Sequence, residues 1–154
     1  MKTFSIAALS FALAVSANVA AHAVERKIPC EKVPSAVHES AKTLITGATL
    51  HGCVEDTSNG KTTYELEFLK NDRNSDMVFD PQGKLLELEE QVDLATLPEP
   101  VKAAFQKAAN GGQIGKVESL KRGGVLKSYE TTITRNGKTK EVAVRPDGSP
   151  IVAD

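Results

Sequence analysis

The feature that most constrains this chain is a set of short motifs that recur 64 or 65 residues apart. The turn Phe79-Asp80-Pro81-Gln82-Gly83 returns as Val144-Arg145-Pro146-Asp147-Gly148. In each copy a proline fixes φ at one corner and a glycine supplies a positive φ. The other landmarks are Val33-Pro34 with Leu97-Pro98, and Tyr64-Glu65 with Tyr129-Glu130. Three landmarks at nearly one period predict two tandem repeats, at about residues 32–90 and 97–152.

Each repeat has the pattern of one helix followed by four strands. The helices are expected over 32–45 and from Leu97 to Ala108, where apolar residues recur at helical spacing. The strands are expected at 49–56, 61–70, 76–80 and 84–89, and again at 113–120, 125–135, 140–145 and 149–152. We therefore predict an α+β fold: one antiparallel sheet of about eight strands, with two helices packed on one face and the other face open.

Residues 1–23 have the pattern of a secretory signal peptide. Lys2 precedes an apolar block from Phe4 to Val15, and Ala21-His22-Ala23 places small residues before a cleavage point. The block is shorter than the roughly 20 apolar residues that span a membrane, so we expect no membrane anchor. This pattern predicts a single periplasmic or secreted domain, residues 24–154.

The net charge gives no general attraction to nucleic acid. Residues 24–154 hold 18 basic and 20 acidic side chains, a net charge of −2. The charge differs between halves: 8 basic minus 14 acidic gives −6 for residues 24–96, and 10 minus 6 gives +4 for residues 97–154. The basic second half lacks the interleaved aromatic residues that stack on bases, so we expect no nucleic-acid partner. Surface ion pairs between opposite halves are weak, and a monomer is expected.

The duplicated landmarks resemble those of the PepSY-like domains, which are related in fold to the secreted β-lactamase inhibitor protein. That pattern is a Leu/Val-Pro helix start, a Tyr-Glu strand and an apolar-Asp-x-x-Gly turn, present twice. It covers roughly Lys32 to Val152, although Arg145 replaces the acidic residue expected before the second turn. The resemblance implies an extracytoplasmic, non-catalytic domain that binds or restrains another protein. No functional residue of the family carries over to this chain.

The two cysteines, Cys30 and Cys53, leave more than one interpretation open. An even pair in an exported protein predicts a disulfide bond. Strand alternation also puts His51 on the same side as Cys53, near His38 of the first helix. A small-ligand or metal site of His38, His51 and Cys53, with Cys30, is therefore an alternative, although its spacing matches no standard zinc pattern. Two free thiols are the third possibility.

No motif of a known catalytic class is found in the sequence. Phosphate-binding and nucleophile-elbow motifs are absent. Paired carboxylates such as Glu87 and Glu89 can perform acid–base chemistry, but on an open sheet they are more typical of a solvated polar face. We expect a non-enzymatic module without a cofactor, which engages a protein partner through the open sheet face. The partner-facing candidates are Glu65, Glu67, Glu130 and Thr132.

Overall fold

The computed structural model describes residues 24–151. The predicted signal peptide and residues 152–154 lie outside this range. The elements, in chain order, are β1 (Val24–Lys27), η1 (Cys30–Lys32), α1 (Ser35–Leu44), β2 (Thr49–Ser58), β3 (Lys61–Lys70), β4 (Arg73–Phe79), β5 (Leu85–Val92), η2 (Leu94–Thr96), α2 (Glu99–Ala109), β6 (Gln113–Arg122), β7 (Val125–Arg135) and β8 (Lys138–Val144). Within residues 24–151 no helix is long and apolar enough to cross a membrane.

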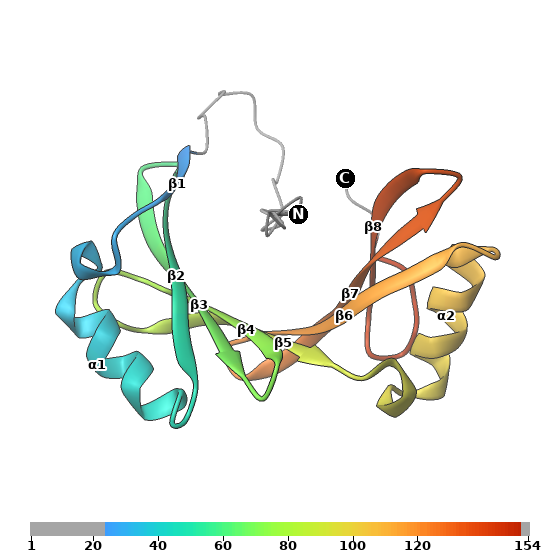
Figure 1. Cartoon of the computed structure of the whole chain (residues 1–154), viewed down its shortest axis with the longest axis horizontal. Coiled ribbons are helices and arrows are strands. Elements are labelled where there is room, and N and C mark those ends of the chain that lie inside the picture. The colour runs from blue at the N-terminus through green and yellow to red at the C-terminus, as the bar shows by residue number, and fades with distance from the viewer. Residues whose placement is uncertain (1–23, 152–154) are drawn as a thin grey trace, which may run out of the picture.

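The strands form one antiparallel sheet in the order β1 to β8, so each strand pairs with its neighbours in sequence. Helix α1 lies between β1 and β2 in the chain, and α2 lies between β5 and β6. The sheet is strongly curved, and both helices lie on its outer side, one at each end (Figure 1). The predicted architecture of two helices on one side of an eight-stranded antiparallel sheet is confirmed.

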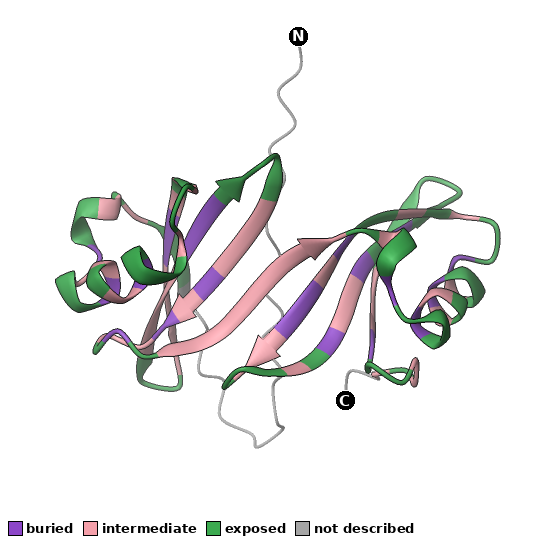
Figure 2. Cartoon of the chain, turned by 90° about the horizontal axis from the view of Figure 1, so that it is seen from below, coloured by how far each residue is buried: buried purple, intermediate pink, exposed green. Residues whose placement is uncertain are grey.

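Each helix has its own hydrophobic core. Buried residues of the first core come from Val33, α1 and β2–β4, and those of the second come from Leu97, α2, β6 and β8. The middle of the sheet lies open between the helices (Figure 2). A cavity of about 700 Å³ occupies this gap, with Leu44, Phe68, Met77 and Val92 among its lining residues. The two helices are apart because the twist of the long sheet separates its two ends.

The prolines decide where both helices begin. Pro34 and Pro98 are the N-cap residues, and the preceding Val33 and Leu97 are extended, as expected for a residue before proline. The predicted first helix therefore begins at Ser35 and not at Lys32.

The sheet edges differ from the prediction. Residues 24–27, for which no strand was predicted, form the edge strand β1 and pair with β2. The predicted strand over 149–152 is reduced, within the described residues, to a bridge between Val144 and Pro150. A backbone hydrogen bond of 3.0 Å from Ile151 to the Ala143 carbonyl follows it. Pro150 has no N–H to donate, which weakens a ladder at this position.

Candidate functional site: the helix-free face of the sheet

The sheet face turned away from the helices is the candidate site, and we call it the helix-free face. Side chains alternate between faces along a strand. Tyr64, Leu66 and Phe68 of β3 contact the first core, so Glu65 and Glu67 project to the opposite side. No element within residues 24–151 lies over this concave side (Figure 1).

Strand pairing brings carboxylates from both halves of the chain into adjacent rows on this face. In one row Glu67 is opposite Asp76, which is opposite Glu89. In the next row Glu118 is opposite Glu130. Such cross-strand neighbours have Cβ atoms about 4.5–5.5 Å apart. We call the set the acidic strip: Glu65, Glu67, Asp76, Glu87, Glu89, Glu118, Glu130 and Glu141.

Crowding and burial change how these acids ionise. Burial raises the pKa of Asp76 to about 7, and the charges of Glu65, Glu118 and Glu67 add to the shift. Burial raises the pKa of Glu89 to about 9, helped by a hydrogen bond and repulsion from Glu87. The strip therefore carries acids that keep their protons near neutral pH.

The pKa values of two further acids of the strip are also raised. Burial raises the pKa of Glu118, where Lys116 opposes the shift and Glu130 adds to it. Burial also raises the pKa of Glu141, with further contributions from the charge and a hydrogen bond of Glu130. Charge also acts between the two halves, because Glu118 contributes to the raised pKa values of Asp76 and Glu89.

Few cations compensate the strip. His51 Nδ1 lies 3.7 Å from Glu67 Oε2, and Arg122 donates from Nε to Glu87 Oε2. The ion pair of Lys121 with Glu90 has a distance of 2.7 Å but lies on the helix side, where Glu90 is opposite Ser119. Within residues 24–151 the carboxylates of this face therefore outnumber its cations.

Gly52 decides where the Glu67 carboxylate lies. The two residues are opposite each other in β2 and β3. A Cβ atom at Gly52 would overlap the Glu67 side chain, including Oε2. The carboxylate thus occupies the space that any other residue at position 52 would fill.

All four predicted partner-facing residues project from the helix-free face. Glu65, Glu67 and Glu130 belong to the acidic strip, and Thr132 is opposite Glu141 at its margin. Sequence reasoning missed Asp76, Glu118 and Glu141 as members of one site. Asp76 lies between buried Met77 and half-buried Ser75, and this alternation could have predicted which face of the sheet Asp76 projects from. It could not have predicted which residues of other strands lie next to Asp76.

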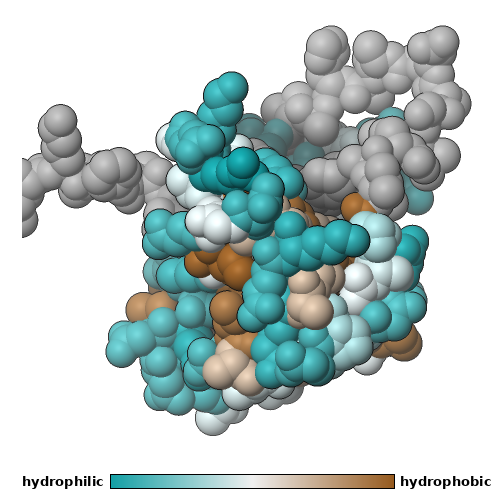
Figure 3. Space-filling model, turned by 90° about the vertical axis from the view of Figure 1, so that its right-hand side faces the viewer, coloured by the Kyte–Doolittle hydropathy of each residue, from teal (hydrophilic) through white to brown (hydrophobic). Residues whose placement is uncertain are grey.

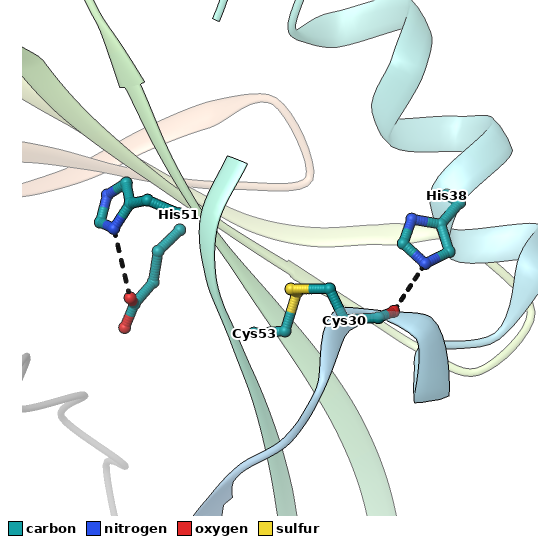
Figure 4. The surroundings of a disulfide bond; sticks show 5 residues. Cys30, His38, His51 and Cys53 are labelled. Atoms are coloured by element: carbon teal, nitrogen blue, oxygen red, sulfur yellow. Dashed lines mark hydrogen bonds and ion pairs between the residues drawn. A yellow bond between two sulfur atoms is a disulfide. The ribbon is translucent and has the colours of Figure 1, made fainter. Parts of the chain in front are cut away.

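The histidines and cysteines do not form one site. Cys30 and Cys53 are joined, with an S–S distance of 2.05 Å, and His38 Nε2 donates to the Cys30 carbonyl at 2.9 Å (Figure 4). His51 lies away from the disulfide, on the helix-free face (Figure 4). The predicted grouping of His38, His51 and Cys53 is wrong. A β-bulge between Leu50 and Gly52 breaks the alternation that would have put His51 and Cys53 on one side.

Loss of the disulfide is expected to destabilise the protein. The bond closes a loop with a sequence separation of 23. Replacing both Cys30 and Cys53 with serine should lower the free energy of unfolding by roughly 3 kcal/mol, because the unfolded chain regains the freedom that the loop removed. Urea denaturation of both proteins measures the difference. Free reaction of both thiols with an alkylating agent in unreduced, exported protein would contradict the bond itself.

The raised pKa of Glu89 predicts a pH-dependent stability. Its pKa is about 9 in the folded chain, whereas the ordinary pKa of a glutamate is 4.5. Between these values the unfolded chain releases a proton that the folded chain keeps, so stability falls as pH rises. Glu89→Gln should remove this loss and stabilise the protein at pH near 8.5 by on the order of 1–3 kcal/mol, with a smaller gain near pH 5.

Urea denaturation at both pH values tests this prediction. Glu31→Gln is the matched control, since it removes one exposed carboxylate outside the strip and should have a small effect at either pH. A gain for Glu89→Gln that is the same at pH 5 and pH 8.5 would contradict the prediction.

Comparison with known proteins gives a likeness in fold. No family model and no curated protein matches the chain. A Bacteroides eggerthii protein described as periplasmic is 15% identical, with a TM-score of 0.65, over 78% of this chain and 86% of its own. A DUF2874 family protein of Bacteroides uniformis is 18% identical, with a TM-score of 0.62, over 77% and 86%. A BLIP-like protein of Bacteroides fragilis is 20% identical, with a TM-score of 0.58, over 79% and 85%. The chain therefore has a fold similar to that of BLIP-like proteins.

Proposed function

We propose that this protein is a non-catalytic periplasmic or secreted module that binds a protein partner through the helix-free face. The observation that carries the proposal is the geometry of that face. It is concave, runs across strands of both halves and is left uncovered by every element within residues 24–151. A broad concave surface of this kind matches the convex surface of another protein better than it encloses a small substrate.

The carboxylates of this face support binding in preference to catalysis. Glu87 and Glu89 hydrogen-bond to each other, and Glu87 also pairs with Arg122. A general acid or base needs access to a bound substrate, whereas these groups are engaged by neighbouring side chains on a broad face. In this proposal the module acts as a monomer, without a cofactor, nucleic-acid partner or membrane anchor.

We also propose that the chain is a tandem duplication, so that the face is built from two equivalent halves. Equivalent contacts about 65 residues apart support this interpretation. In the sheet, the pairing of Phe79 with Leu85 corresponds to that of Val144 with Pro150. Beside the helices, the close approach of Gly83 to Ala36 corresponds to that of Gly148 to Pro100. We include in the same proposal that the chain is related to the PepSY-like domains that its repeated motifs resemble.

Site-specific photocrosslinking in the native envelope tests the proposed function. A photoreactive amino acid at Thr132, which is exposed on the helix-free face, should capture a discrete protein. The matched control places it at Gln106, an exposed position of α2. Capture of a protein from position 132 and not from position 106 supports the proposal. The same products from both positions, or none from position 132, would overturn it.

A further inference from the structure

The charge of the helix-free face is concentrated where it would contact a partner. Eight carboxylates form the acidic strip across β3 to β8. The described cations near it are Arg122, which is paired with Glu87, Lys116, which acts on Glu118, and His51 beside Glu67. Lys127 and Arg145 also lie near its β8 end, where they line a cavity together with Glu130 and Glu141. Like charges on opposite positions of a sheet destabilise it. The free protein limits this repulsion by keeping protons on acids such as Glu89, and a positively charged partner would favour their ionised forms.

A second, independent observation is that carboxylate oxygens on this face lack hydrogen-bond donors. Glu67 is only 8% exposed, and within residues 24–151 no hydrogen bond reaches its carboxylate, the His51 nitrogen being 3.7 Å away. Asp56, on the same face of β2, has a buried Oδ1 atom without a hydrogen-bond partner among the described residues. Buried carboxylate oxygens are normally hydrogen-bonded or paired with a cation. Of these oxygens, Asp56 Oδ1 is the buried atom without a hydrogen-bond partner among the described residues, whereas Glu67 lies within ion-pair distance of His51. Both carboxylates can accept further hydrogen bonds from donors that a partner would supply.

The length of the strip matches an extended peptide segment. Five steps between neighbouring strands separate β3 from β8, and at about 4.8 Å each they span roughly 24 Å. An extended segment of about seven or eight residues has this length. Side chains on one side of such a segment alternate along it, so about four of them face the strip.

A cavity of about 520 Å³ lies at the β8 end of the face. Its apolar lining includes Leu120, Ala143 and Ile151. Its charged lining residues are Arg122, Lys127, Glu130, Glu141 and Arg145. From the end of the molecule that carries α2 and β8, hydrophobic residues are visible in a recess between hydrophilic side chains (Figure 3). This end therefore suits an apolar side chain, whereas the rows of acids towards β3 suit cations.

We propose that the helix-free face binds an extended, lysine- or arginine-rich segment of the partner protein, with its cations over the acidic strip and an apolar side chain in the β8-end cavity. This inference rests on the proposed function, because it names the chemistry of the partner for the same face. Charge complementarity selects the occupant: an acidic segment would add to the repulsion within the strip. Guanidinium groups suit this surface well, since each can donate two parallel hydrogen bonds to a carboxylate.

Peptide binding to the exported, disulfide-bonded protein tests the inference. The probe is the blocked peptide Lys-Thr-Lys-Thr-Lys-Thr-Lys-Leu, and its counterpart has glutamate at every lysine position. The strip variant is Asp76→Asn/Glu89→Gln/Glu118→Gln. The matched control is Glu31→Gln/Glu39→Gln/Glu99→Gln, which replaces the same number of carboxyl groups at exposed positions on or next to the helices.

Fluorescence titration should show that the basic peptide binds and the acidic peptide does not. The dissociation constant of the basic peptide should rise about tenfold or more in the strip variant and less than about twofold in the control. This difference is expected if binding depends on partly desolvated contacts with the strip and not on the net charge of the protein. Equal losses in both variants, or no binding of the basic peptide to the unaltered protein, would overturn the inference. Thermal denaturation confirms that each variant is folded, and Glu118→Gln alone, expected to weaken binding in the same direction, replaces the strip variant if that does not fold.

The inference and the proposed function fail in different ways. If crosslinking from position 132 is unchanged in the strip variant, the proposal of a protein partner stands, but the inference that its basic segment binds the strip is excluded. If the basic peptide binds selectively but no protein is crosslinked, the inference of a cation-binding surface stands and the proposed function is overturned.

Discussion

Phe105→Ala is expected to lower the free energy of unfolding by about 3–5 kcal/mol. The Phe105 ring is 0% exposed and belongs to the second core with Val101, Val117 and Val144. Because this core is separate from the first, no other large side chain of α1 or β3 can move in to fill the cavity that the substitution leaves. The loss would be a large share of the 5–15 kcal/mol by which typical domains are stable.

Urea denaturation followed by circular dichroism measures this effect. Val125→Ala is the matched control, since Val125 is 57% exposed and its truncation should change stability by no more than about 0.5 kcal/mol. A loss below about 1 kcal/mol for Phe105→Ala would show that the second core is not packed as described, because fully buried phenylalanines cost several times more.

Gly83→Ala and Gly148→Ala are expected to cost roughly 2–5 kcal/mol each, for two combined reasons. Both glycines have positive φ, +83° and +81°, a conformation that strains a residue with a Cβ atom. In addition, a Cβ at Gly83 would overlap the Ala36 carbonyl at the start of α1, and one at Gly148 would overlap the Pro100 carbonyl in α2. The turns would have to move off the helices they contact.

Gly60→Ala separates the two causes. Gly60 has a φ of +72°, but nothing lies within 4 Å of the position its Cβ would take. The control should therefore show only the conformational cost, about 1–2 kcal/mol. Urea denaturation of the three variants gives the comparison. Equal losses at positions 60, 83 and 148 would contradict the close approach of the turns to the helices.

Local patterns predicted the elements well because their causes are local. The apolar spacing of Val37 and Ala41, and of Val101 and Phe105, specifies which side of each helix is buried. Proline before each helix also specifies where it begins, although the prediction placed both starts ahead of the proline, at residue 32 and at Leu97. The alternation around Leu66 specifies that Glu65 and Glu67 turn away from the core. These expectations required no knowledge of which strand lies next to which.

Two features depended on contacts that the sequence does not encode locally. The bulge at His51 moved this side chain to the helix-free face, and an extra residue in one strand is invisible to a strict alternation. The distance between the helices likewise depends on sheet twist accumulated over many strands. The predicted histidine and cysteine grouping was wrong for the first reason.

The sequence alone determined the charges of the halves, −6 for residues 24–96 and +4 for residues 97–154. It predicted an electrostatic contrast between the two halves. The tertiary structure decided that acids of both halves share one face, because the pairing of β5 with β6 sets Glu89 and Gln91 opposite Leu120 and Glu118. Which carboxylates become neighbours depends on strand register, and register is set only when the strands of the whole sheet come together.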